Sequence, residues 1–276
     1  MTEYVRPRDL DEALAVRAEH PAWMVIAGGT DLMVNANHQA VPAGMIDLWR
    51  LAELGFVRVT DQAIAIGAGT TWHEVERHPA IRERIAPLAA AAREIGALQI
   101  QARATLGGNV GTSSPVGDSL PVLLALDAEL EVASVRGRRR VPYHAWCTGY
   151  RTTQLAADEL IVAAHVPVPS PTTRTTWRKI GTRRAQSISK VMGAAAIMLD
   201  GDIVTEARVA LGAVAERPIR IAAVEAAVRG LRLGPAAEAA RAAVRTAIKP
   251  IDDVRSTASY RREVAENLVA RFFAVS

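Results

Sequence analysis

The sequence contains a single cysteine, Cys147, among its 276 residues. One cysteine cannot form a disulfide within the chain, and iron–sulfur clusters are typically held by about four cysteine thiolates. The six histidines lack metal-ligand spacing, because even the nearest pair, His73 and His78, is five residues apart. We therefore expect no metal site in this chain. Any cluster that delivers electrons to it must lie on another polypeptide.

Aromatic residues are also scarce, at 4% of the chain, and long apolar runs are missing. No run approaches the roughly 20 residues that cross a bilayer, and segment 1–7 lacks a hydrophobic signal-peptide core. These features predict a cytoplasmic protein without a membrane span. The net charge is +4 and the pI is about 9.6. Without aromatic stacking platforms, this basicity does not indicate nucleic acid binding.

Basic residues are concentrated in one short stretch, Arg136-Gly137-Arg138-Arg139-Arg140. Two interpretations are open for it. A solvated hairpin loop tolerates such a run, and a docking patch for an acidic partner subunit would use it.

Glycine is clustered where it can serve a ligand. Segment 104–118 contains three glycines within five positions, followed by hydroxyl side chains. Glycines let a backbone pass close to a ligand and point its N–H groups inward, which suits a phosphate. A second such segment is Ala27–Asp31, at the carboxyl end of a strand expected over 23–26. Two such turns suit a ligand with two linked phosphates, although each glycine pair alone is also explained by a tight bend.

The pattern of elements predicts an α+β chain in three parts, at 1–55, 56–170 and 171–276. Asp9 with Glu12, and Thr71 with Glu74, have the spacing of helix capping boxes, and Pro235 suits a first helical turn. Segment 167–171 is proline-rich and predicts a stiff linker. The last third predicts an antiparallel sheet backed by helices. The expected helices are 10–19, 86–95, 120–126, 218–229, 235–248 and 257–273, and the expected strands include 45–48, 56–59, 63–66, 129–133, 160–164, 194–199 and 204–211.

The two glycine segments, in this order and spacing, resemble the FAD-binding subunit of the molybdenum hydroxylases, the group that includes xanthine dehydrogenase and carbon monoxide dehydrogenase. The resemblance extends over nearly the whole chain. Its most specific part is Gln99–Asn109 leading to Ser114–Asp118, and further matching blocks are Arg178–Lys190 and Tyr260–Arg262. It implies a two-part FAD-binding domain of the vanillyl-alcohol-oxidase/molybdenum-hydroxylase type.

The resemblance also implies roles for individual residues. The first glycine segment would lie along the pyrophosphate, with Asp31 turned away and accepting hydrogen bonds from backbone or a sugar hydroxyl. The second segment would form the opposite wall, and Asp118 would accept from ribityl hydroxyls. The cofactor-binding residues implied are Ile26, Ala27, Gly28, Gly29, Thr30, Asp31, Leu32, Ile100, Thr105, Gly107, Gly108, Asn109, Thr112, Ser114, Asp118, Lys179 and Ile188.

The same resemblance would place Ile100, Ile188 and Lys179 near the isoalloxazine ring. Reduced flavin is anionic, so a lysine there would stabilise the reduced form. The alternative is an exposed strand lysine. The carbon monoxide dehydrogenase branch resembles AGGQS at the first turn, with a tyrosine near position 188. This chain has Thr30-Asp31 and Ile188 instead, which favours the xanthine-dehydrogenase-like branch.

The resemblance implies an electron-transfer flavoprotein subunit with no catalytic residues of its own. FAD would pass electrons from [2Fe-2S] clusters on a small partner to NAD or another acceptor, while molybdopterin would lie in a large partner subunit. A free-standing FAD oxidoreductase and a non-catalytic nucleotide-binding module are the alternatives. The sequence names neither the hydroxylated substrate nor the terminal acceptor, and does not distinguish a heterotrimer from its dimer.

Overall fold

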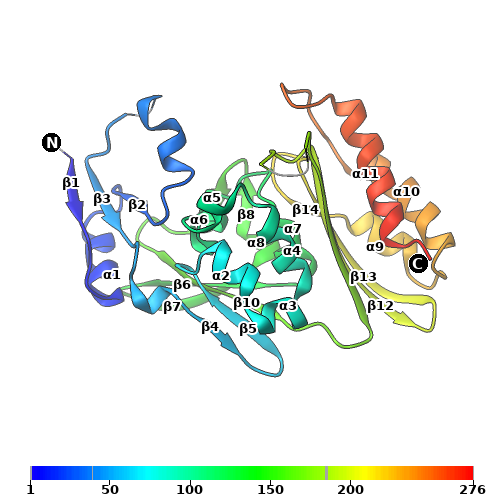
Figure 1. The fold of residues 1–276 in the computed structure, drawn as a ribbon, viewed down its shortest axis with the longest axis horizontal. Coiled ribbons are helices and arrows are strands. Elements are labelled where there is room, and N and C mark those ends of the chain that lie inside the picture. Colours follow the sequence, from blue (N-terminus) through cyan, green and yellow to red (C-terminus); the bar gives the residue numbers. More distant parts are fainter. Residues whose placement is uncertain (1, 39, 184–185, 276) are drawn as a thin grey trace.

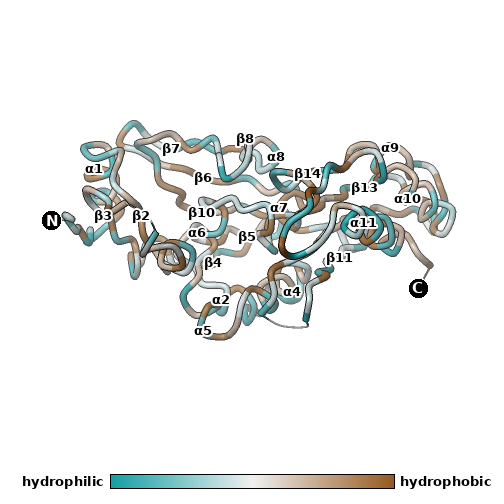
Figure 2. Tube along the Cα trace, turned by 90° about the horizontal axis from the view of Figure 1, so that it is seen from above, coloured by the Kyte–Doolittle hydropathy of each residue, from teal (hydrophilic) through white to brown (hydrophobic). Residues whose placement is uncertain are grey.

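The computed structural model describes residues 2–38, 40–183 and 186–275. The chain forms three main sheets that follow one another along an elongated molecule, with the two termini at opposite ends (Figures 1 and 2). Two positions of the predicted block 178–190, Arg184 and Ala185, lie outside the described residues.

The N-terminal part is a small parallel sheet with the strand order β1-β3-β2. Asp9 caps the predicted helix through a bond from the Glu12 N–H (2.8 Å). The Glu12 carboxylate accepts from the Arg8 N–H instead, so only half of the predicted capping box forms. Strand β1 was not predicted. The elements here are β1 (Glu3–Val5), α1 (Leu10–Glu19), β2 (Met24–Ile26), the 3-10 helix η1 (Leu32–His38), β3 (Gly44–Asp47) and η2 (Ala52–Leu54).

The central part is a five-stranded antiparallel sheet in the order β4-β5-β10-β6-β7. Thr71 and Glu74 form the predicted capping box, and Pro79 starts a new helix. The elements are β4 (Val57–Val59), β5 (Ala63–Gly67), α2 (Trp72–Arg77), α3 (Pro79–Arg84), α4 (Ala86–Glu94), α5 (Leu98–Gln101), α6 (Leu106–Thr112), α7 (Leu120–Ala125), β6 (Glu129–Ser134), β7 (Gly137–Pro142), α8 (Tyr143–Trp146), β8 (Cys147–Gly149), β9 (Thr152–Thr153) and β10 (Leu160–Pro167).

The arginine cluster forms the edge strand β7, so the hairpin-loop interpretation is wrong for Arg138, Arg139 and Arg140. Each of these guanidiniums has an acidic partner within the chain, namely Glu131, Glu159 and Glu129 respectively. Arg136 in the preceding turn pairs with Asp158. Because intramolecular carboxylates already balance these charges, the cluster offers little unpaired charge to an acidic partner.

The C-terminal part is the predicted antiparallel sheet backed by helices, with strands in the order β11-β12-β13-β14. Helices α9, α10 and α11 cover its outer face, and α4 and α7 lie against its inner face (Figure 1). Pro235 occupies the first turn of α10, as predicted. The elements are β11 (Thr173–Ile180), β12 (Val191–Asp200), β13 (Ile203–Gly212), β14 (Ile219–Arg220), α9 (Ala222–Val228), α10 (Pro235–Ala247) and α11 (Ala258–Phe272).

Hydrophobic cores join the three parts. Leu160 and Val162 of β10 pack into the N-terminal core together with Leu14 of α1. On the other side, Trp177 and Ala194 of the C-terminal sheet belong to the central core. The boundaries 1–55, 56–170 and 171–276 stay predictions, and these shared cores mean that neighbouring parts support one another.

Candidate functional site

The first glycine segment leaves β2 and turns sharply at Gly29, which has a φ of +74° that favours glycine. Within the described chain, the backbone N–H groups of residues 28–31 have no hydrogen-bond acceptor. A Cβ on Gly28 would lie 1.8 Å from the Arg103 carbonyl oxygen, so glycine is required for this close contact. The segment therefore combines unpaired donors with a backbone pressed against the chain that leads into the second glycine segment.

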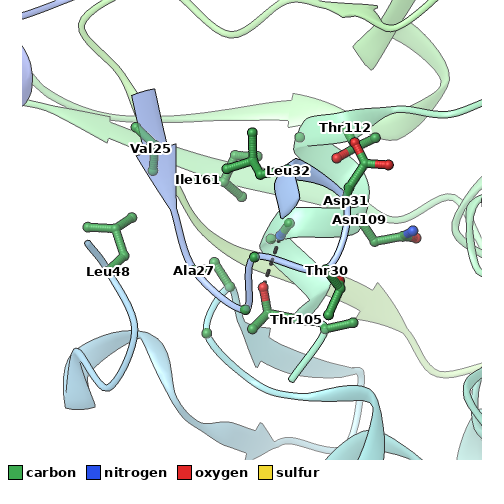
Figure 3. Close-up of a pocket in the computed structure, with 18 of the residues that line it drawn as sticks. Val25, Ala27, Thr30, Asp31, Leu32, Leu48, Thr105, Asn109, Thr112 and Ile161 are labelled. Atoms are coloured by element: carbon green, nitrogen blue, oxygen red, sulfur yellow. Dashed lines mark hydrogen bonds between the residues drawn. The ribbon is translucent and has the colours of Figure 1, made fainter. Parts of the chain in front are cut away.

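The second glycine segment is the helix α6 rather than the open turn that we expected. Thr105 caps it, and its hydroxyl accepts from the Gly108 N–H at 3.0 Å (Figure 3). The Leu106 and Gly107 N–H groups donate to the carbonyl oxygens of Thr70 and Ala68. All three donors of the first turn are thus already satisfied, and the prediction that they point at a phosphate is wrong for them.

Gly107 of α6 serves packing instead. A Cβ on Gly107 would approach Ala68 to 2.7 Å, so its absence lets the helix lie against the central sheet. A Cβ on Gly108 would meet only the Thr105 hydroxyl, at 3.2 Å. Gly108 therefore presents a smooth wall to the space between the two glycine segments.

That space is a cavity of about 510 Å³. Figure 3 shows Val25 and Leu48 on one side of it and Asn109 and Thr112 on the other. Predicted site residues from both glycine segments line it together, namely Ala27, Gly28, Gly29, Thr30, Asp31, Leu32, Ile100, Thr105, Gly107, Gly108, Asn109, Thr112 and Ser114. Ile26 does not line it, and its side chain packs toward Gly29 instead.

Sequence reasoning missed the apolar end of this cavity. Its walls come from segments far apart in the chain, so only the burial of Val25 in a strand beside the first glycine segment gave any signal. The missed lining residues include Arg17, Trp23, Val25, Leu48, Leu54, Leu155, Leu160 and Ile161.

A second cavity of about 310 Å³ shares Ile100 and Val116 with the first. Ile188 and Asp118 also line it. The structure thus brings together Ile100 and Ile188, two of the three residues that the resemblance placed near the isoalloxazine ring. The third, Lys179, lines neither cavity.

Lys179 is buried, so the interpretation as an exposed strand lysine is wrong. Its side chain is 4% exposed, and its ammonium donates to the Asp118 carboxylate at 2.6 Å and to the Glu94 carbonyl oxygen at 3.1 Å. The Ser189 hydroxyl donates to the other Asp118 oxygen at 2.6 Å. Burial raises the pKa of the Asp118 carboxyl, and the Lys179 charge and the Ser189 hydroxyl oppose that rise. Asp118 therefore stands, already paired, between Lys179 and the second cavity.

The Asp31 carboxylate accepts from the Arg151 guanidinium at 3.1 and 3.2 Å, rather than from backbone as one expectation had it. Arg151 lies in the turn between β8 and β9, and the bond to Asp31 raises its pKa. The two residues are 120 positions apart, and no sequence signal linked them. The pair ties the first glycine segment to the central part of the molecule and neutralises a carboxylate that would repel an anion.

Comparison with known proteins assigns this architecture. Residues 1–169 match the FAD binding domain in molybdopterin dehydrogenase, and residues 177–275 match the CO dehydrogenase flavoprotein C-terminal domain. The chain belongs to this flavoprotein family. It is thus an oxidoreductase subunit whose cofactor is FAD.

Relatives of this flavoprotein are named as parts of several different dehydrogenases. It is 30% identical to the nicotinate dehydrogenase FAD-subunit of Eubacterium barkeri, over 98% of this chain and 94% of that protein. It is 34% identical to the putative xanthine dehydrogenase FAD-binding subunit of Escherichia coli, over 79% of this chain and 75% of that protein. Carbon monoxide dehydrogenase from Hydrogenophaga pseudoflava superposes with a TM-score of 0.93 at 29% identity, over 98% and 95%.

The flavoprotein's own residues fit FAD. The unpaired N–H groups of residues 28–31 suit a pyrophosphate, whose oxygens need donors. The cavity beside them has an apolar end, and the second cavity beyond Ile100 offers a separate place for a second ring system. Within the described residues, no helix is long and apolar enough to cross a membrane, and no group of three or more histidine, cysteine or acidic side chains is placed to hold a metal.

Proposed function

We propose that FAD lies along the two cavities, with its pyrophosphate at residues 28–31 and its isoalloxazine ring toward Ile100 and Ile188. The observation that carries this proposal is that residues 28–31, whose backbone N–H groups have no acceptor within the described chain, line the same cavity as the glycines of α6. Thr112, Asn109 and Ser114 line the same space and supply polar side chains for the ribityl and phosphate oxygens. These residue roles go beyond the family assignment.

Bound there, FAD would supply the capacity to exchange electrons singly or in pairs. The chain's residues would bind and orient it. Asp118 has both oxygens engaged by Lys179 and Ser189, so it is held rigidly at the wall of the second cavity, where a remaining lone pair can accept from a ribityl hydroxyl. The paired Lys179 contributes a dipole rather than a full positive charge, which weakens its expected effect on the reduced flavin.

The functional role that we propose is electron transfer within a larger molybdenum hydroxylase. A small partner subunit with [2Fe-2S] clusters would deliver electrons, and NAD or another acceptor would receive them. Substrate hydroxylation would occur at molybdopterin on a large partner subunit, in a cytoplasmic heterotrimer or its dimer. Thr30, Asp31 and Ile188 favour a xanthine- or purine-dehydrogenase-like complex over the carbon monoxide dehydrogenase type.

The test is purification of the protein from its own host under native conditions, followed by its visible spectrum and subunit composition. We expect flavin and iron–sulfur absorbance with two co-eluting chains, and activity toward purines in assays with NAD. A yellow chain that elutes alone and oxidises a substrate would support a free-standing oxidoreductase. A colourless chain that takes up no added FAD would contradict the flavin site. The non-catalytic nucleotide-binding module would then be the remaining alternative.

A further inference from the structure

Arg17 is a cation at the apolar end of the first cavity with no acidic partner among the described residues. It extends from α1 and lines the cavity beside Trp23 and Val25. The only hydrogen bond of its side chain within the described chain runs from one terminal nitrogen to the Trp23 carbonyl oxygen, at 2.7 Å. Its Nε is buried without an acceptor. A guanidinium has five N–H donors, so most of its donor capacity is unused.

The neighbouring acids are already occupied. Glu159 lines the same cavity, but its carboxylate accepts two bonds from Arg139 at 2.7 Å and one from the Ala156 N–H at 2.8 Å. Asp158 pairs with Arg136 at 2.5 Å. Burial lowers the pKa of the Arg17 guanidinium, an effect that the more distant Asp158 opposes. Arg17 is thus a half-buried cation without an acidic partner among the described residues, and its buried Nε is a donor that an acceptor on a ligand could satisfy.

Arg17 is oriented by its hydrogen bond to a well-packed residue, Trp23. Trp23 is 9% exposed and its ring stacks on His20, with ring centroids 3.8 Å apart and planes 5° from parallel. This stack holds the Trp23 backbone, whose carbonyl oxygen in turn anchors the guanidinium at the cavity wall. One terminal nitrogen of the guanidinium is therefore held at the cavity wall, and the other N–H donors stay available to a ligand.

The surroundings suit a flat heteroaromatic ring. Val25 and Leu48 supply apolar walls at this end, away from Asn109 and Thr112 (Figure 3). With the pyrophosphate at residues 28–31 and the isoalloxazine beyond Ile100, this end receives the other half of FAD, the adenosine. Adenine ring nitrogens and ribose oxygens are acceptors that a guanidinium fork can reach, and guanidiniums also stack on bases.

We propose that Arg17 donates hydrogen bonds to the adenosine half of FAD and so makes the chain select FAD over FMN. The inference rests on the proposed orientation of FAD in the cavity. FMN lacks the adenosine and leaves Arg17 unpaired, so the energetic benefit of pairing it is available to FAD alone. Arg17 is a specificity residue and takes no part in electron transfer.

The experiment uses the full chain stripped of flavin. FAD and FMN are titrated into the wild type, Arg17→Met and Arg17→Lys, with flavin fluorescence as the readout, and AMP is added as a competitor of FAD. In Arg17→Met we expect FAD binding to weaken roughly 10-fold or more and FMN binding to change less than about 2-fold. AMP should compete with FAD in the wild type and lose most of that effect in Arg17→Met. Arg77→Met, on the exposed surface of α2, is the matched control and should change neither affinity.

Equal weakening of FAD and FMN would overturn the inference, because Arg17 would then only support the wall through Trp23. Unchanged affinity for both flavins would overturn it as well. A wild type that binds neither flavin would contradict the flavin site itself, which is a separate result. If Arg17→Met does not fold, Arg17→Lys decides, since it can keep the Trp23 bond but loses the fork, and its FAD-to-FMN preference should still fall.

Discussion

At the scale of single residues, Gly28 carries the clearest steric requirement. A methyl group there would overlap the Arg103 carbonyl oxygen, a backbone atom that cannot swing aside. Because the Gly28 φ is not positive, the requirement comes from this contact rather than from backbone conformation. We expect Gly28→Ala to displace the first glycine segment and cost about 1–3 kcal/mol of flavin binding, measured as the dissociation constant of FAD.

Gly55→Ala is the control for that variant. A Cβ at Gly55 meets only the Ala52 carbonyl oxygen, at 3.8 Å, an ordinary contact. Its FAD affinity should match the wild type. Wild-type affinity in Gly28→Ala would show that FAD binding does not need the close contact between Gly28 and the Arg103 backbone.

The sequence was informative where a residue belongs to a recognisable motif. The glycine motifs around Gly28 and Gly108 pointed to a shared site, and the structure places both residues on one cavity. Two contacts could not be predicted in this way. The Asp31–Arg151 ion pair depends on how distant segments pack, and the Arg17–Trp23 hydrogen bond involves an arginine that belongs to no motif, so neither contact left a pattern of periodicity or spacing in the sequence.

At the scale of elements, α6 depends on its cap. Thr105 is 2% exposed and is the N-cap residue whose hydroxyl satisfies the Gly108 N–H. We expect Thr105→Ala to lower the free energy of unfolding by about 1 kcal/mol, because a glycine-rich helix has little intrinsic stability to compensate. Urea denaturation of the chain measures this change in the free energy of unfolding. Thr105→Ser keeps the hydroxyl and should restore most of the loss, whereas equal loss in both variants would point to the methyl group instead.

The elements that could be predicted have their signals within a few residues. The Thr71–Glu74 box and Pro235 mark helix starts through side chains that act on adjacent backbone. Helix α6 was taken for a turn because glycine disfavours helix, although the Thr105 cap was present in the sequence. The insertion of β10 between β5 and β6 is a matter of long-range pairing, and short β1 has too few residues to show a period.

At the scale of the whole molecule, the Lys179–Asp118 pair joins the C-terminal sheet to the central part. Lys179 lies on β11, whereas Asp118 precedes α7 and Glu94 ends α4. Removing one partner leaves a buried, unpaired charge, so Lys179→Met should lower the free energy of unfolding by about 3–5 kcal/mol. Guanidinium chloride denaturation followed by tryptophan fluorescence is the measurement.

The double variant Lys179→Met with Asp118→Asn removes both charges and should recover part of the stability that the single variant loses. Lys249→Met, at an exposed position, is the control and should change stability by less than about 0.5 kcal/mol. If Lys179→Met unfolds like the control, the pair does not hold the sheet in place.

The walls of the first cavity begin at Arg17 and end at Ile161. During synthesis on the ribosome, the first glycine segment therefore emerges long before β10, which supplies Leu160 and Ile161 to the cavity and must also enter the sheet between β5 and β6. A nascent chain shorter than this has no closed pocket to retain a flavin. Cofactor capture in this protein is thus a late event, which can begin only after more than half of the polypeptide has been translated.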